Sequence, residues 1–105
     1  MIAWTFTYTE HVDRFLSKLS DDDLAKTRNM FRLFEEYGAT LPTKYMKRMS
    51  GTKNLWELRA KRVRIFFFID GNRGIGVHGI VKKSQRTPKS AIDLAIQRAR
   101  LMCGV

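Results

Sequence analysis

Residues 63–70, VRIFFFID, constrain the fold more than any other part of the chain. Alternate residues of a strand point to opposite faces of a sheet, so over residues 63–69 one face is wholly apolar and the other is apolar except at Arg64. A strand with two apolar faces belongs in the interior of a sheet, where both faces are shielded from water. Helices must therefore cover one side of the sheet, and the other side must be partly covered or act as a binding surface.

Shorter patterns on either side of this run predict the remaining elements. Alternation of apolar and polar residues predicts strands over about residues 2–8, 55–59 and 75–81. Apolar residues at helical spacing predict helices over about 10–19 and 21–37 and a last helix with Pro88 at its first position. Ser20 and Thr87 act as N-terminal caps, and Gly38 is a left-handed stop. Residues 70–74, DGNRG, form a hairpin turn, and residues 40–53 read as an irregular or briefly helical linker.

These elements follow one another in the order β-α-α-β-β-β-α, which predicts an α+β fold with a small antiparallel sheet and helices packed on one face. A chain of 105 residues is large enough for one hydrophobic core, so we expect a single domain over residues 1–105. The start, MIAWTFTYTEHV, lacks the segments of a signal peptide, and no apolar run approaches the roughly 20 residues of a membrane span. We therefore expect a soluble, cytoplasmic protein.

Basic side chains are concentrated in the middle of the chain. Residues 44–89 carry 13 lysines and arginines against 2 acidic residues, whereas residues 1–43 carry 5 against 7. The whole chain has a net charge of +10. Such a local excess repels itself on folding and is most often relieved by a polyanion. A solvated basic surface kept for solubility is the alternative.

The sequence lacks the patterns of several common kinds of site. The glycines Gly71, Gly74 and Gly76 lie in the predicted hairpin without a following helix, so they indicate a turn rather than a nucleotide-binding loop. The single cysteine excludes an internal disulfide and a cysteine-based zinc cluster. His11 and His78 lie on unrelated elements, with no carboxylates at ligand spacing beside them. We expect neither a metal nor a cofactor.

A set of cations remains, and the predicted strands bring them together. Arg59 ends one strand and Arg64 begins the next, so a tight connection should place them side by side. Lys82, Lys83 and Arg86 follow the last strand, at the edge where the strand of Arg64 begins. Arg64 and Lys83 can then converge on one point, as the binding of a phosphodiester requires. Each of these cations, taken alone, could also be a solvated charge at the end of a strand.

Several motifs of the chain resemble a known family. They are LWELR at residues 55–59, RIFF at 64–67, and His78-Gly79 followed by KKSQ-x-TP at 82–88, with Ala95 and Arg98 in the last helix. Together they closely resemble the phage-derived HigB-like branch of the RelE/ParE toxin superfamily, over nearly the whole chain. The resemblance implies a compact RelE-like α+β fold and a type II toxin, usually a ribosome-dependent messenger-RNA endonuclease.

The resemblance also implies partners. They are a small helix-turn-helix antitoxin that neutralises the toxin, messenger RNA on the ribosome, and ribosomal RNA, with no membrane involved. A heterotetramer with the antitoxin is an assembly that the family allows.

The resemblance assigns roles to some residues and leaves others open. Arg64 matches the arginine that opens the third strand in RelE-type toxins and contacts the scissile phosphate, and Lys83 falls near their second catalytic arginine. Two departures concern proton transfer. Leu55 and Glu57 stand where RelE has a pair of lysines, and Lys89 stands near the place of its C-terminal tyrosine.

RNA cleavage without a metal uses the 2′-hydroxyl of the substrate as nucleophile, so the protein must orient the chain, stabilise the phosphorane and move two protons. Arg64 and Arg59 would hold the phosphate. Candidates for proton transfer are Lys82, Lys83, Glu57 and His78. The remaining cations of the predicted RNA-binding set are Lys53, Arg62, Arg86 and Lys89.

Structural alternatives stay open for several of these residues. Glu57 could simply pair with Arg59 or Lys61, and His78 could be a packed core histidine. Two other functions also stay open. One is a ParE-like toxin that inhibits DNA gyrase without nuclease activity, and the other is an RNA-binding module that only docks on ribosomal RNA.

Overall fold

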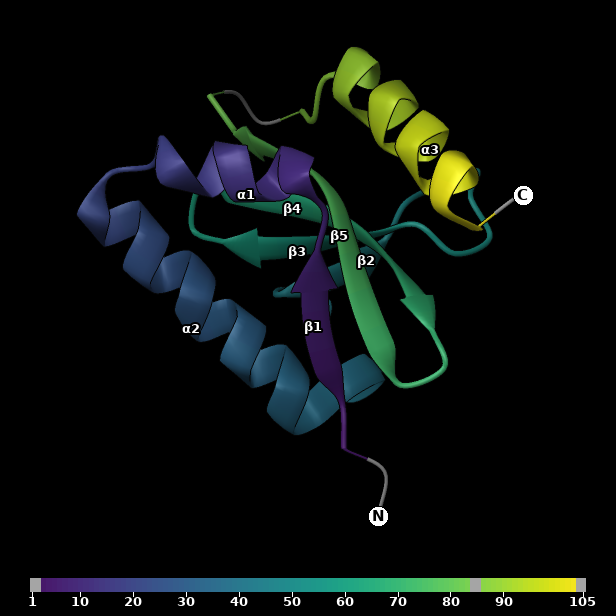
Figure 1. Cartoon of the computed structure of the whole chain (residues 1–105), viewed down its shortest axis with the longest axis horizontal. Helices are drawn as coiled ribbons and strands as arrows, with labels where there is room; N and C mark the ends of the chain where they lie inside the picture. Colours follow the sequence, from purple (N-terminus) through teal and green to yellow (C-terminus); the bar gives the residue numbers. More distant parts are fainter. Residues whose placement is uncertain (1–2, 84–85, 104–105) are drawn as a thin grey trace.

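A computed structural model describes residues 3–83 and 86–103. One sheet contains five strands in the order β1-β5-β4-β3-β2, and β4 occupies its centre (Figure 1). In chain order the elements are β1 (Thr5–Tyr8), α1 (Glu10–Ser17), α2 (Asp21–Tyr37), a short 3-10 turn η1 (Gly38–Thr40), β2 (Met46–Arg48), β3 (Trp56–Ala60), β4 (Val63–Asp70), β5 (Arg73–Val81) and α3 (Lys89–Cys103). The expected interior position of residues 63–70 is confirmed.

The α+β class is confirmed, but the sheet is mixed rather than wholly antiparallel. Strands β2 to β5 pair antiparallel with their neighbours, whereas β1 lies parallel to β5, with Thr5 opposite Arg73. Two helices follow β1 before the chain returns to the sheet, so β1 was free to pair with a strand distant in the sequence. Ile2, which we also expected in the first strand, lies outside the described residues.

Strand β2 lies inside the segment that we expected to be a linker. It pairs antiparallel with β3, and Met46 is buried while Lys47 and Arg48 are exposed. Three residues are too few to show a period-2 pattern in the sequence. The charged side chains of β2 suit an edge strand, because they discourage pairing with another chain.

Helices cover both faces of the sheet, which differs from the expected packing on one face. α1 and α2 pack on the face that carries Val63, Ile65 and Phe67. α3 covers the opposite face, where Phe66 and Phe68 are buried in a second cluster with residues of α3. Helices therefore shield both apolar faces of β4 from water. Exposure of either face would lose the favourable free energy of burying its apolar surface.

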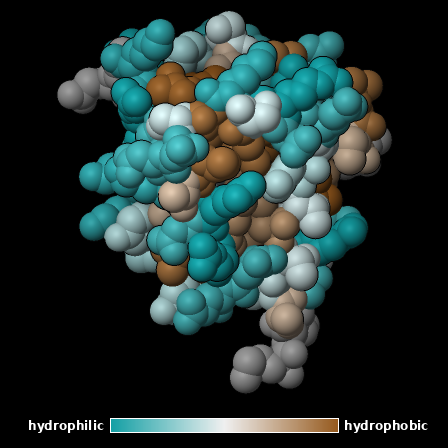
Figure 2. Space-filling view, turned by 60° about the vertical axis from the view of Figure 1, so that its left-hand side comes forward, coloured by the Kyte–Doolittle hydropathy of each residue, from teal (hydrophilic) through white to brown (hydrophobic). Residues whose placement is uncertain are grey.

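On the side of the sheet that α1 and α2 cover, some apolar side chains remain partly exposed to solvent. Figure 2 brings this side forward and shows an apolar area surrounded by hydrophilic side chains. Several apolar residues that pack on the first cluster are only partly buried, among them Phe6, Phe15 and Leu19.

The ends of α2 follow the sequence closely. The Ser20 hydroxyl accepts a hydrogen bond from the Asp23 backbone N–H at 3.2 Å, and Gly38 ends the helix with a φ of +58°. The last helix begins at Lys89, one residue later than expected. None of the helices in the described part of the chain is long and apolar enough to span a membrane.

Candidate functional site

An open groove of about 710 Å³ lies where three parts of the fold meet: the start of α2, the turn between β3 and β4, and the end of β5. It is lined by six basic and two acidic side chains: Asp22, Asp23, Lys26, Lys61, Arg62, Arg64, Lys82 and Lys83. Such an excess of cations in one concave surface attracts phosphate groups.

The strand register builds the groove. Arg59 on β3 lies directly opposite Arg64 on β4, because the turn between the strands consists only of Lys61 and Arg62. The backbone N–H of Lys82 donates to the carbonyl of Arg62 at 2.6 Å, which brings the residues after β5 beside this turn. The expected pairing of Arg59 with Arg64 is thus confirmed, and Arg64 and Lys83 line one groove.

Arg64 is held from several sides. Its side chain is 13% exposed, and its Nη1 donates to the carbonyls of Lys61 and Val63. Its Nε lies 3.8 Å from Oε1 of Glu57, is buried, and has no hydrogen-bond partner. Burial lowers the pKa of the Arg64 guanidinium, while the Glu57 carboxylate opposes this shift. An arginine stays charged despite such a shift, so Arg64 is a fixed cation in the wall of the groove.

Glu57 is a buried carboxylate with both oxygens engaged. It is 2% exposed; its Oε1 pairs with Nε of Arg59 at 2.8 Å, and its Oε2 accepts a hydrogen bond from the Thr87 hydroxyl at 2.9 Å. The ion pair with Arg59, one of the alternatives for Glu57, is therefore present. This geometry favours a role in orienting Arg59 and Arg64 over proton transfer to a substrate.

His78 lies apart from the groove and faces α3. Its ring stacks on Phe66 at a centroid distance of 6.0 Å, and its Nδ1 lies 2.8 Å from Nη1 of Arg98. Burial, together with the charges of Arg98 and His11, lowers the pKa of His78 to about 4. The imidazole is therefore neutral near pH 7, and Nδ1 accepts the hydrogen bond from Arg98, since a guanidinium can only donate.

The other expected RNA-binding residues divide into two groups. Arg62 lines the groove. Lys53, Arg86 and Lys89 are exposed and are not among its lining residues. Lys53 precedes β3 and so lies at the opposite end of that strand from the turn.

The sequence of the chain matches a known protein family. The family model of the phage-derived Gp49-like proteins (DUF891) matches residues 14–100. The chain belongs to this family. No protein with a curated description matches it significantly.

Solved structures show that this Gp49-like chain has the fold of RelE toxins. An Escherichia coli RelE double mutant in the free state superimposes with a TM-score of 0.68 and 12% identity, covering 92% of this chain and 98% of that one. RelE in the Methanococcus jannaschii RelB–RelE antitoxin–toxin complex gives 0.62 and 14%, covering 78% and 99%. The Mycobacterium tuberculosis RelBE2 toxin–antitoxin complex gives 0.65 and 15%, covering 77% and 100%. The phage-derived family and the RelE-like fold that we expected are confirmed.

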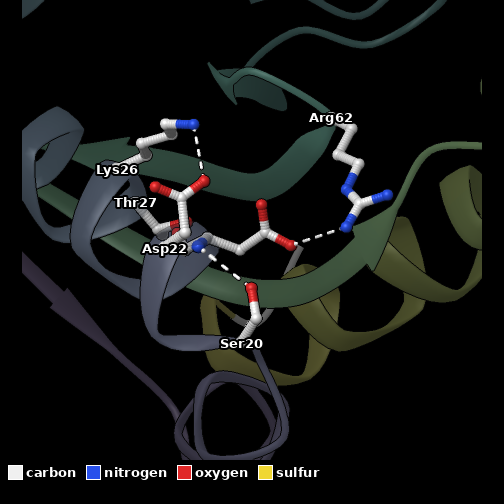
Figure 3. Close-up of polar contacts among 6 residues, drawn as sticks. Ser20, Asp22, Lys26, Thr27 and Arg62 are labelled. Carbon is white, nitrogen blue, oxygen red and sulfur yellow. Dashed lines mark hydrogen bonds and ion pairs between the residues drawn. The ribbon is translucent and has the colours of Figure 1, made fainter.

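Sequence reasoning missed several residues of the Gp49-like site. Asp22, Asp23 and Lys26 come from the first turns of α2, where three consecutive aspartates indicate only a favourable charge at the helix start (Figure 3). Thr87, expected as the cap of α3, donates its hydroxyl hydrogen bond to Glu57. No local signal marks the contacts of Asp23 with Arg62 and of Thr87 with Glu57, because they join residues 39 and 30 positions apart in the sequence.

Proposed function

We propose that this Gp49-like protein is the toxin of a type II toxin–antitoxin pair and cleaves messenger RNA on the ribosome. The observation that carries the proposal is the convergence of Arg64, Lys82 and Lys83 in one open groove of a RelE fold. Three cations at one point can bind the non-bridging oxygens of a phosphodiester and stabilise the extra negative charge of a phosphorane.

The bond changes of the reaction can be written with the substrate and these side chains, while the ribosome presents the messenger RNA. The 2′-hydroxyl attacks the adjacent phosphorus, the bond to the 5′-oxygen breaks, and the products are a 2′,3′-cyclic phosphate and a 5′-hydroxyl. Arg64, fixed by its backbone contacts, stabilises the phosphorane. Lys82 or Lys83 carries the proton that leaves the 2′-hydroxyl or reaches the 5′-oxygen. Glu57 and His78 serve as supports, since one is buried in ion pairs and the other faces α3.

The proposal includes the partners and the compartment. RelE from Methanococcus jannaschii and the toxin of RelBE2 were each solved in complex with an antitoxin. By analogy we assign to this chain a cognate antitoxin of the helix-turn-helix kind, encoded beside it. Its substrate is messenger RNA in the ribosome, so it acts in the cytoplasm.

Cell-free translation tests the proposal. Wild-type protein should stop synthesis and produce new transcript 5′ ends within codons, mapped by primer extension, and only when ribosomes are present. Arg64→Ala should lower the rate of cleavage at least 100-fold, because the principal phosphorane ligand is lost. Arg28→Ala is the matched control, since it removes an exposed arginine of α2 outside the groove and should cleave like wild type.

Other outcomes would replace the proposal. Cleavage that survives Arg64→Ala would contradict the assigned site. Intact transcripts together with inhibited supercoiling by DNA gyrase would instead support a ParE-like toxin. Binding to ribosomes without any new 5′ ends would indicate a module that only docks on ribosomal RNA.

A further inference from the structure

Asp23 is a buried acid in the wall of a basic groove. Its residue exposure is only 7%, whereas the neighbouring Asp21 and Asp22 are exposed. A favourable interaction with the helix dipole does not require burial, because exposed acids in the first turn provide it as well. The burial of Asp23 therefore calls for a second role.

The carboxylate of Asp23 joins α2 to the turn between β3 and β4. Its Oδ2 lies 3.2 Å from Nη2 of Arg62, a residue 39 positions further along the chain (Figure 3). The side chain of Arg62 is 65% exposed, so this ion pair contributes little to global stability. The effect of this ion pair is local, because it fixes the position of the turn that carries Arg62.

This turn is the frame on which the groove cations are placed. Three consecutive carbonyls, two in the turn and one at the start of β4, bind two of these cations. The carbonyls of Lys61 and Val63 accept hydrogen bonds from Nη1 of Arg64, and the carbonyl of Arg62 accepts one from the backbone N–H of Lys82. Lys61 has a φ of +58°, a left-handed conformation that is unfavourable for a non-glycine residue and persists only where contacts hold it. A shift of the turn would move Arg64 and Lys82 together.

The charges of the groove also indicate that Asp23 stabilises the position of the turn. The six cations of the groove repel one another before any RNA binds, and two of them, Lys61 and Arg62, lie in the turn itself. A carboxylate paired with Arg62 offsets part of that repulsion without occupying Arg64, Lys82 or Lys83.

We propose that Asp23 is a positioning residue for the groove: through Arg62 it holds the β3–β4 turn against the start of α2, and so places Arg64 and the residues after β5. The inference rests on the proposed function of the groove for its effect on cleavage. Its effect on the turn can be measured independently of any activity.

The experiment compares Asp23→Asn with Asp21→Asn, which removes an exposed acid from the same helical turn. Two quantities are measured for each: the hydrogen-exchange rate of the Lys82 amide, and the maximal rate and half-saturating concentration for cleavage on programmed ribosomes. Asp23→Asn should speed exchange at Lys82 about tenfold and lower the maximal rate about tenfold, with the half-saturating concentration within about twofold of wild type. Asp21→Asn should match wild type in both.

A double-mutant comparison completes the test. Arg62→Gln should speed hydrogen exchange at Lys82 as Asp23→Asn does, and exchange in the double variant should be no faster than in either single variant, because both break one link. Asp23→Glu, which keeps the carboxylate, should recover part of the rate. The inference would be overturned if Asp23→Asn and Asp21→Asn gave equal Lys82 exchange rates and equal cleavage kinetics. It would also be overturned if the effects of the two single variants on Lys82 exchange multiplied in the double variant. If wild type does not cleave but Lys82 exchange still rises in Asp23→Asn, the positioning stands and the nuclease proposal fails.

Discussion

At the scale of single residues, buried acids hold neighbouring cations in place. Glu57 is the clearest case, because it binds Arg59 and Thr87 at 2.8 and 2.9 Å and lies 3.8 Å from Arg64. A long cationic side chain on a surface samples many rotamers, and a fixed carboxylate beneath it reduces that freedom. The phosphate-binding geometry that we propose for the groove thus depends in part on the buried Glu57.

His78 supplies a prediction at this scale. The pKa of His78 in the folded protein is about 4, below its ordinary value of 6.5, so the unfolded chain binds a proton that the folded protein excludes. Its contribution to stability is complete above pH 6.5 and is lost as the pH falls from 6.5 toward 4. His78→Asn keeps an acceptor for Arg98 but cannot take up this proton.

Urea denaturation at about pH 7 and about pH 5 measures the effect. Between these pH values wild type should lose more of its free energy of unfolding than His78→Asn does. Carboxylates that titrate in the same range affect both proteins equally, so the comparison isolates His78. Equal losses in the two proteins would show that His78 carries no depressed pKa in the folded state.

At the scale of elements, the sequence predicts most clearly what is long or chemically marked. The run 63–70 and the boundaries of α2 could be predicted, because β4 has two apolar faces and α2 has Ser20 and Gly38 at its ends. β2 could not, since it has three residues and gains its structure from pairing with β3. The position of α3 on the second face also depends on packing against Phe66 and Phe68, which no local pattern specifies.

The end of α2 gives a prediction at this scale. Gly38 has a φ of +58°, and a Cβ added there would lie 2.1 Å from the indole of Trp4. Gly51 has a φ of +79° with no atom within 4 Å of such a Cβ. Gly51→Ala should therefore cost about 1 kcal/mol from backbone strain alone. Gly38→Ala should cost about 1–3 kcal/mol more, because Trp4 must move.

Chemical denaturation of both variants separates the two effects. The difference between them reports the packing of Trp4 on the end of α2 together with the backbone strain at Gly38, whose ψ of −135° lies outside the left-handed helical region. Equal free energies of unfolding would mean that the indole gives way without cost and does not fix the junction between β1 and α2.

At the scale of the whole molecule, charge segregation could be predicted, but the assembled groove could not. The count of 13 basic residues in 44–89 indicates a polyanion partner. It does not reveal that Lys53 and Lys89 lie outside the groove, or that the acidic start of α2 forms one of its walls. Proximity in the groove results from the sheet order, which places the end of β5 beside the β3–β4 turn.

The salt dependence of RNA binding tests this distribution of charge. The affinity for a short single-stranded RNA, measured by fluorescence anisotropy, should fall linearly with the logarithm of salt concentration. Lys83→Ala should reduce the slope by about 0.7, the effect of one lost phosphate contact on a single strand. Lys18→Ala removes an exposed lysine at the end of α1 and should leave the slope unchanged. Equal slopes for all three proteins would place the RNA away from the groove.

The pairing of β1 with β5 bears on how this protein is made. Thr5 of β1 lies opposite Arg73 of β5. β1 therefore has no partner strand until most of the chain has been synthesised. Lys82 and Lys83 follow directly after β5. A nascent chain interrupted before that point lacks Lys82 and Lys83, two of the six basic residues that line the groove.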